Sequence, residues 1–173
     1  AIERLTIQFG TSMCYPISSF GAHVAARPRT SLKTRGNVAM CGTFGYELDP
    51  RKLTDDEKAE VKQQIADYRK YHRLVREGDF YRLVSPTEND FYCAWEFVSP
   101  DKQEAMMTAV VMRQPETRYC VQRLRGLDPK TYYQDEETGT VYSGAMLMNA
   151  GLNLTRDVYE DGTSVAKHFK AVK

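Results

Sequence analysis

The chain has 173 residues, of which 42% are hydrophobic, so it can bury a core and does not have a disordered composition. Its 24 basic and 23 acidic residues leave a formal charge of +1, which provides no field for steering nucleic acid or an anionic membrane. No apolar run approaches the about eighteen residues of a membrane-spanning helix. The sequence therefore predicts no nucleic-acid partner and no membrane partner.

Four cysteines are widely spaced and form no C-x-x-C pair: Cys14, Cys41, Cys93 and Cys120. A structural zinc site uses closely spaced ligand pairs, and a disulfide scaffold is usually smaller and richer in cysteine. The pattern predicts free, buried thiols, no metal site and no cofactor. Free thiols in turn favour a location in the reducing cytoplasm.

The first predicted element is a helix that ends at Gly10. Ile2, Leu5 and Phe9 recur at helical spacing and form one apolar stripe. A helix usually begins after a side chain that accepts a backbone N–H, and nothing precedes Ala1 to do so. Either this helix frays at its start, or its capping residue lies in a part of the protein not present here.

Residues 20–25 form a short apolar run that predicts a buried strand. A helix is expected over residues 31–48, capped by Thr30 or Ser31, because apolar residues recur there near helical spacing (Leu32, Val38, Cys41 and Leu48). Three glycines in this segment each cost a helix about 1 kcal/mol relative to Ala. They indicate close packing against a neighbour: Gly36, Gly42 and Gly45.

The next helix is predicted to start at Thr54 and to end at Gly78. Thr54 with Glu57 three residues later forms a capping box. His72 lies on the apolar stripe of this helix, where we expect a hydrogen-bonded, partly buried histidine without a catalytic role.

From Asp79 the periodicity changes from helical to alternating, which predicts strands. Residues 91–97 are the clearest case, and Trp95 and Phe97 are expected to face the core of the domain. Further strands are predicted over residues 80–84, 104–112, 117–124, 131–134 and 164–172. The chain is thus divided into a helical part, residues 1–78, and an antiparallel β part, residues 79–173.

No catalytic motif is visible in the residues themselves. The sequence has no Gly-x-Ser-x-Gly elbow, no His-Glu-x-x-His helix and no phosphate-binding glycine loop. The acidic run Asp135, Glu136 and Glu137 is predicted to be a solvated hairpin tip, where burial would not raise a pKa. His23 and His168 have no partner nearby in the sequence.

Four stretches, in the same order, are similar to one known family: AIERLTIQFGTSMCYPISSFGAHVAA, LKTRGNVAMCGTFGYELD, YRLVSP and YSGAMLMNAGL. Together they resemble the C-terminal region of the bacterial α-galactosidases of glycoside hydrolase family 36. That family has a β-rich N-terminal domain, a (β/α)8 barrel and a C-terminal antiparallel β domain.

The resemblance implies an α+β fold, in which residues 1–78 are the end of the (β/α)8 barrel (its last strand and closing helices) and residues 79–173 form an antiparallel β-sandwich domain. The opening helix would then follow barrel strand seven. Residues 20–25 would be strand eight and residues 31–48 a closing helix. On this interpretation the chain starts inside the barrel, which also explains the uncapped first helix.

The resemblance also implies a retaining glycosidase mechanism, in which two carboxylates about 5–5.5 Å apart act as nucleophile and acid/base. In the family the nucleophile lies in an upstream Trp-Asp motif. The acid/base lies in a Ser-Asp-x-Thr-Asp stretch that ends just before the segment matching residues 1–5. Neither motif is present, so no catalytic residue is predicted in this chain, and the chain alone is predicted to be inactive. His23 is the candidate substrate-binding residue.

One segment departs from the family pattern. Relatives carry Pro-Asn-His-Gln and Gly-Arg after the strand of residues 20–25, whereas here Pro28 runs directly into RTSLKTRG. Either the loop is shortened or part of it is missing from the sequence. It would lie on the face where barrel active sites form, which puts direct substrate contacts from this region in doubt.

Two hypotheses from different classes remain. The first is the C-terminal part of a hydrolase acting on terminal α-galactosides such as raffinose or melibiose. The second is a non-catalytic β-sandwich module for carbohydrate binding or oligomerisation, which an exposed, planar set of aromatic side chains would favour. On the first hypothesis, the rest of the barrel or a second copy must cover the apolar side chains of the helical part: Ile2, Leu5, Phe9, Val38 and Cys41.

Overall fold

The computed structural model describes residues 1–26, 29–114 and 120–172. The predicted loop shortening at Arg27 and Pro28 lies outside the described residues, as do residues 117–119 of one predicted strand. The first part of the chain contains, in order, α1 (Ile2–Ser12), a 3-10 turn (Ile17–Ser19), β1 (Gly21–Ala25), α2 (Leu32–Ala39), β2 (Thr43–Glu47), a second 3-10 turn (Pro50–Lys52) and α3 (Asp55–Glu77).

The predicted helix over residues 31–48 is wrong in its second half. The helix ends at Ala39, and β2 then pairs in parallel with β1, with Gly21 opposite Thr43 and Ala25 opposite Glu47. Threonine and aromatic residues in β2 favour a strand, and the glycines before and within it favour an end to the helix. The barrel-like part therefore contains two parallel strands joined by a helix, where the sequence predicted a single strand.

All three glycines mark close packing, as the sequence predicted; a Cβ on Gly42 would lie 2.8 Å from the Phe20 carbonyl oxygen. A Cβ on Gly36 would lie 2.5 Å from Cδ of Gln64, so a larger residue would have to displace this side chain from between α2 and α3. Gln64 is buried there, and its Nε2 donates to the Leu32 carbonyl at 3.1 Å. A Cβ on Gly45 would lie 2.8 Å from Cδ2 of His23 on the neighbouring strand.

Helix α3 begins as predicted. Thr54 accepts from the Glu57 N–H at 3.2 Å, and the Glu57 carboxylate accepts from the Thr54 N–H at 2.9 Å, which completes the capping box. His72 is hydrogen-bonded, through Nδ1 and the Arg69 carbonyl oxygen at 2.9 Å, but it is exposed and not partly buried.

The second part is built on one six-stranded antiparallel sheet of order β3-β4-β5-β10-β7-β8. Its strands are β3 (Asp79–Val84), β4 (Tyr92–Val98), β5 (Glu104–Val111), β7 (Tyr132–Asp135), β8 (Val141–Ser143) and β10 (Ser164–Val172). A small pair, β6 (Val121–Gln122) and β9 (Leu152–Asn153), and helix α4 (Gly144–Asn149) complete the described elements. The strands predicted over residues 80–84, 91–97, 104–112, 131–134 and 164–172 are confirmed, whereas of residues 117–124 only Val121–Gln122 is a strand in the described part of the chain. Helix α4 and strands β8 and β9 were not predicted.

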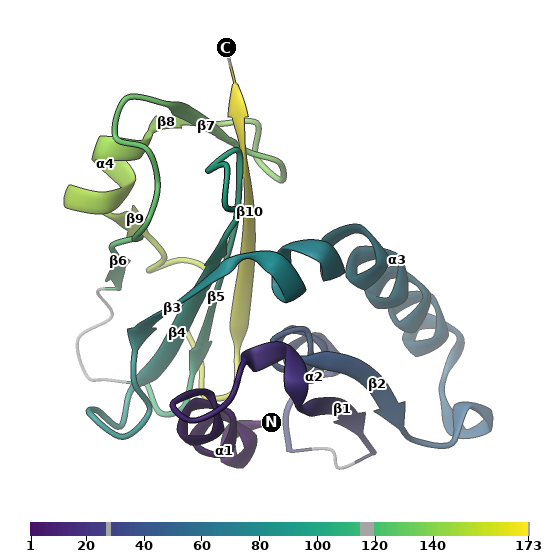
Figure 1. The fold of residues 1–173 in the computed structure, drawn as a ribbon. Coiled ribbons are helices and arrows are strands. Elements are labelled where there is room, and N and C mark those ends of the chain that lie inside the picture. The colour runs from purple at the N-terminus through teal and green to yellow at the C-terminus, as the bar shows by residue number, and fades with distance from the viewer. Residues whose placement is uncertain (27–28, 115–119, 173) are drawn as a thin grey trace.

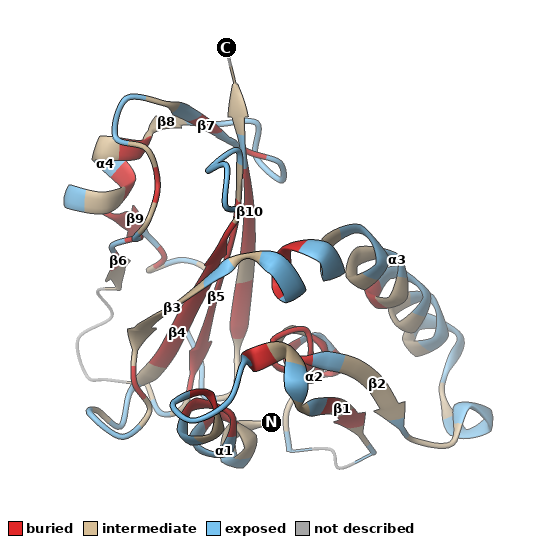
Figure 2. Ribbon diagram, in the orientation of Figure 1, coloured by how far each residue is buried: buried red, intermediate tan, exposed pale blue. Residues whose placement is uncertain are grey.

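Both faces of this sheet are covered, which Figure 1 shows and Figure 2 marks as buried along β4, β5 and β10. One face packs under α4 and the β6–β9 pair around a core that includes Leu124, Leu147 and Phe169. The other face packs against α1, α2 and the end of α3. Helices, a parallel strand pair and an antiparallel sheet together confirm the predicted α+β class.

Trp95 and Phe97 are buried, at 1% and 0% exposure, as predicted. The core they face is the one shared with the helical part, because β4 alternates between the two faces of the sheet. The Trp95 ring meets Phe9 of α1 edge to face, with 6.4 Å between the ring centroids.

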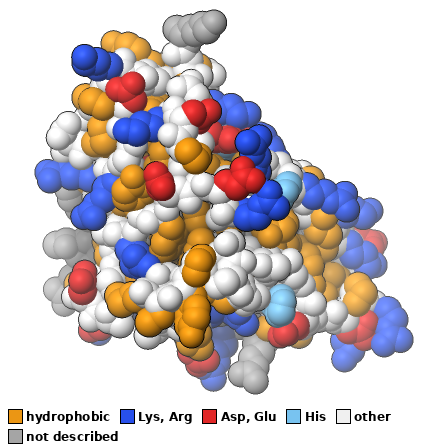
Figure 3. All heavy atoms as spheres, in the orientation of Figure 1, with side chains coloured by type: hydrophobic (Ala, Val, Ile, Leu, Met, Phe, Trp, Pro, Cys, Tyr) orange, Lys and Arg blue, Asp and Glu red, His pale blue; other side chains and the backbone are white. Residues whose placement is uncertain are grey.

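The five apolar side chains of the helical part were expected to need cover from the rest of the barrel or from a second copy. For four of the five this is wrong, because residues 79–173 cover them within the chain itself. The same core buries all four against the sheet: Leu5, Phe9, Val38 and Cys41. Ile2 is only partly buried at its edge. Ile7, on another side of α1, is 67% exposed. Figure 3 shows hydrophobic side chains gathered at the end of the molecule where α1 lies, at the bottom of the view.

The acidic hairpin tip is also different from the prediction. Asp135 is 1% exposed, and the buried Lys167 of β10 lies between it, at 3.4 Å, and Glu137, at 2.5 Å. Glu136 points to the opposite face of β10, where it meets Lys170 at 2.7 Å. The run does form a hairpin tip, and Glu136 and Glu137 are exposed as predicted, but Asp135 is buried. All three carboxylates contact lysines of β10, on both faces of that strand, so they are not left to repel one another.

Cys41 and Cys93 are buried free thiols, and burial raises the pKa of each thiol above its ordinary value. Cys14 is exposed, so the prediction of buried thiols fails there. Among the described residues, none of the helices combines the length and the apolarity needed to cross a membrane.

We expect Trp95→Ala to lower the free energy of unfolding by about 3–5 kcal/mol, because it opens a cavity in the core that both parts share. Chemical denaturation followed by far-UV circular dichroism measures the change. Tyr159→Ala is the matched control, since Tyr159 is 49% exposed and its loss should cost less than about 0.5 kcal/mol. Equal effects from the two variants would contradict the shared core.

We expect Glu96, a buried carboxyl of β4, to make the free energy of unfolding depend on pH. Burial raises the pKa of this carboxyl from 4.5 to about 8, although the Arg125 N–H, 2.8 Å from Oε2, acts in the opposite direction. As the pH rises from about 4.5 to about 8, the unfolded chain ionises first, so the free energy of unfolding falls, by on the order of a few kcal/mol. Glu96→Gln should remove this decline and unfold at higher denaturant than the parent at pH 9. Glu88→Gln, at an exposed site, should leave the decline unchanged.

Candidate functional site

Strands β1 and β2 present one covered face and one open face. Ala22 and Val24 of β1, with Phe44 and Tyr46 of β2, pack toward α2 and α3 in a small core. Since side chains alternate along a strand, His23 of β1 and Glu47 of β2 lie on the open face. Among the described residues, β1 and β2 pair only with one another, so each has a free outer edge.

His23 and Glu47 form a polar pair on this open face. His23 Nδ1 lies 2.9 Å from Glu47 Oε1, and the two side chains are 38% and 61% exposed. Gly45 lies opposite His23 in the register, and its missing side chain leaves the room that the imidazole occupies. The pairing is therefore diagonal, from His23 across Gly45 to the last residue of β2.

A cavity of about 390 Å³ lies beside this pair, lined by Glu3, Arg4, Ile7, His23, Ala25, Arg35, Val38 and Glu47 among others. Arg35 donates to the Ala25 carbonyl at 2.6 Å, and Arg4 donates to the Gly21 carbonyl at 3.2 Å. Two guanidinium groups thus fix the ends of β1 and hold α1 and α2 against it.

The arrangement suits hydrogen bonding to a polar ligand. A carboxylate accepts from hydroxyl groups, and the imidazole both orients that carboxylate and offers its second ring nitrogen. Glu47 was not singled out from the sequence. The signal that could have identified it is the parallel pairing, because the carboxyl end of a barrel strand is where functional side chains gather.

The other candidate functional side chains, His72 and His168, lie away from this cavity. Within residues 1–26, 29–114 and 120–172, no group of His, Cys, Asp and Glu side chains has the arrangement to hold a metal ion. His168 lies in the β sheet, between Glu104 and Glu136, and His72 lies on the outside of α3. That His23 binds substrate, and that this chain holds no catalytic residue, both stay predictions.

Family models match both parts of the chain. The Melibiase model matches residues 1–78, and the glycosyl hydrolase family 36 C-terminal domain model matches residues 92–169. The chain is 50% identical to α-galactosidase AgaA of Geobacillus stearothermophilus over 161 residues, which is 89% of this chain and 22% of the relative. It is 45% identical over 161 residues to the bifunctional α-galactosidase/sucrose kinase AgaSK of Mediterraneibacter gnavus, covering 89% of this chain and 17% of that protein.

Solved structures agree over nearly the whole chain. The galactosidase domain of AgaSK superposes with a TM-score of 0.93 at 42% identity, covering 99% of this chain and 24% of that one. AgaA of G. stearothermophilus, solved in complex with raffinose, gives a TM-score of 0.91 at 46% identity, over 99% of this chain and 24% of that one. The chain spans about a quarter of these solved chains. With a match in each of its two parts, in the same order along the chain, the chain belongs to glycosyl hydrolase family 36 and corresponds to about a quarter of the length of the α-galactosidases that it matches.

Proposed function

We propose that this chain supplies the C-terminal part of a retaining α-galactosidase that hydrolyses terminal α-galactosides of the raffinose and melibiose type. The observation that carries the proposal is the open face of β1 and β2, whose free strand edges and exposed His23–Glu47 pair fit the inside of a barrel that further strands would complete. AgaA has been solved with raffinose and, in another variant, with stachyose, which supports this substrate class.

In this assignment the chain contributes the last two strands of the barrel. Helix α3 leads directly into the β sheet, so β2 is the eighth strand and β1 the seventh. This numbering differs from the one implied by the resemblance, with residues 20–25 as strand eight, because that one took β2 for part of a helix. The nucleophile and the acid/base belong to earlier strands, and the β domain holds the final helices in place through the shared core.

The alternative, a carbohydrate-binding module, needs an exposed aromatic platform. Exposed aromatic side chains do occur, at Tyr15, Phe91, Tyr132 and Tyr159. Among the described residues, none of these four stacks on another aromatic ring, and the largest aromatic side chain, Trp95, is in the core. The first proposal is therefore preferred. The buried free thiols Cys41 and Cys93 fit a reducing cytoplasmic location for the enzyme.

A chimera tests the function. The matching C-terminal segment of AgaA is replaced by this chain, and hydrolysis of an aryl α-galactoside and of raffinose is measured. We expect turnover from the chimera and none from the chain alone, because both required carboxylates would come from AgaA. AgaA that lacks its matching C-terminal segment, with nothing put in its place, is the control for background activity. Turnover by the pure, mass-verified chain alone would show that the active site has been misplaced.

The same chimera tests His23 and Glu47. We expect His23→Gln and Glu47→Gln each to lower kcat/KM by about tenfold or more, which corresponds to about 1.4 kcal/mol of lost transition-state binding. Thr43→Ser is the matched control, since Thr43 begins the same open face of β2 and should leave kcat/KM within about twofold. Unchanged kinetics in both Gln variants would remove His23 and Glu47 from the substrate pocket.

A further inference from the structure

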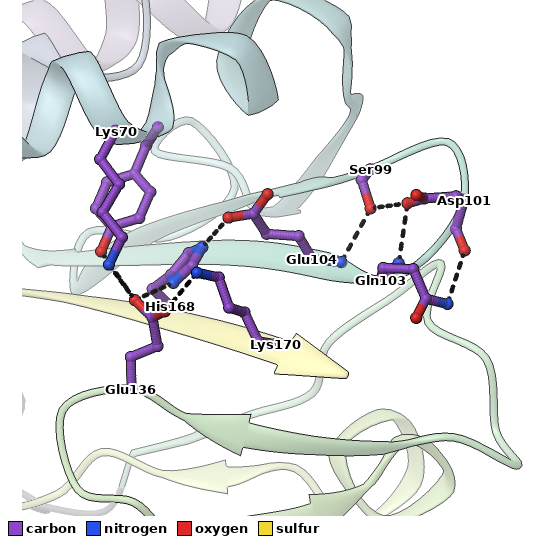
Figure 4. Close-up of polar contacts among 9 residues, drawn as sticks. Lys70, Ser99, Asp101, Gln103, Glu104, Glu136, His168 and Lys170 are labelled. Atoms are coloured by element: carbon purple, nitrogen blue, oxygen red, sulfur yellow. Dashed lines mark hydrogen bonds and ion pairs between the residues drawn. The ribbon is translucent and has the colours of Figure 1, made fainter. Parts of the chain in front are cut away.

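His168 lies at the junction of the helical part and the sheet, away from the open face of β1 and β2. It is 7% exposed on β10, and the Tyr71 ring of α3 packs on its imidazole with 4.2 Å between centroids. Figure 4 shows the imidazole between two carboxylates, Glu104 of β5 and Glu136 of the β7–β8 hairpin.

The two contacts involve both ring nitrogens. Nε2 lies 2.6 Å from Glu104 Oε1, with hydrogen-bond geometry. Nδ1 lies 2.7 Å from Glu136 Oε2, at an angle that is poor for a hydrogen bond. A neutral imidazole carries one N–H, so one of these oxygens would then face a nitrogen lone pair. An imidazolium, with a proton on each nitrogen, suits both contacts.

The surrounding charges divide unequally between the two carboxylates. Glu136 also meets Lys70 of α3 at 2.5 Å and Lys170 of β10 at 2.7 Å, and it accepts from the Tyr71 hydroxyl at 3.2 Å. Desolvation acts to raise the pKa of Glu136, but Lys170, Lys70 and His168 together lower it to about 2. Glu136 therefore stays charged throughout the neutral range.

Glu104 has fewer cationic partners than Glu136, so its pairing depends more on the charge of His168. In the part of the chain that the structure describes, the imidazole is the direct charged partner of this carboxylate, with Arg73 of α3 at longer range. A cavity of about 420 Å³ lies beside it, lined among others by Lys70, Leu74, Asp101 and Glu104, so water reaches the contact. The turn before β5 fixes Glu104, since its N–H donates to the Ser99 hydroxyl at 2.9 Å.

We propose that the His168 clasp, defined as Lys70, Tyr71, Glu104, Glu136, His168 and Lys170, is a pH-responsive joint that fastens α3 to the β sheet while His168 is an imidazolium. Histidine is the side chain that changes charge near neutral pH. The sign follows from the contacts: a ring protonated on both nitrogens holds Glu104 and Glu136 together against the Tyr71 ring of α3. As the ring loses its proton with rising pH, Glu104 loses its cation and Glu136, which binds Lys70 and Tyr71 of α3, loses one of its three cations. The inference does not depend on α-galactosidase activity.

Glu96 also lowers stability as the pH rises, so the test is made in the Glu96→Gln background of the full chain. Hydrogen exchange of the amides in residues 68–77, corrected for intrinsic rates, is compared at pH 5.5 and pH 8.5. We expect protection to fall about tenfold over this range, and to be independent of pH once His168→Gln is added. His72→Gln is the matched control, because this exposed histidine of α3 should leave the pH dependence intact.

A second measurement applies even if His168→Gln fails to fold. Ring ¹⁵N shifts of the three histidines, assigned with His23→Gln and His72→Gln, report protonation directly. We expect both His168 nitrogens to be protonated at pH 5.5, and Glu104→Gln to reduce the fall in protection. A neutral His168 at pH 5.5, protection that does not change with pH, or an unchanged fall in the His168→Gln variant would each overturn the proposal.

Discussion

The fold depends on one constraint, that the central strands of the sheet are apolar on both faces. Along β4 and β5, successive residues alternate between a core under α4 and a core under the barrel-like helices. A sheet of this kind exposes a hydrophobic surface whenever either cover is removed. Residues 1–78 are therefore not an appendage of the β domain, because their helices complete one of its two cores.

The charged residues reinforce the same joint. The acidic hairpin between β7 and β8 straddles β10, with Asp135 and Glu137 on Lys167 and Glu136 on the opposite face. Glu136 then meets Lys70 of α3, so one hairpin ties the sheet to the last helix of the first part. The net contribution of such ion pairs to stability is small, because desolvation of the buried charges offsets their attraction.

Local signals in the sequence predicted the elements whose patterns are complete within a few residues. The capping box at Thr54 and the alternation from Phe91 to Phe97 needed no information from elsewhere in the chain. The strand Thr43–Glu47 was missed because the near-helical spacing of the apolar residues was given more weight than its own strand-favouring residues, and because no local period reveals its pairing with Gly21–Ala25. Glu47 was missed for the same reason, since only the register brings it beside His23.

The burial of Asp135 in the acidic run of residues 135–137 was missed for a related reason, because the cations that pair with the run are distant in the sequence. Three adjacent carboxylates resemble a solvated turn when only their own segment is considered. Their cations, Lys70 and Lys167, lie far away in the sequence, and the alternation of β10 sends neighbouring side chains to opposite faces. The β domain can therefore place one carboxylate in its own core and the next on α3. In a family 36 enzyme this geometry would let the C-terminal domain set the position of the final barrel helix, and through it the strands that carry His23 and Glu47.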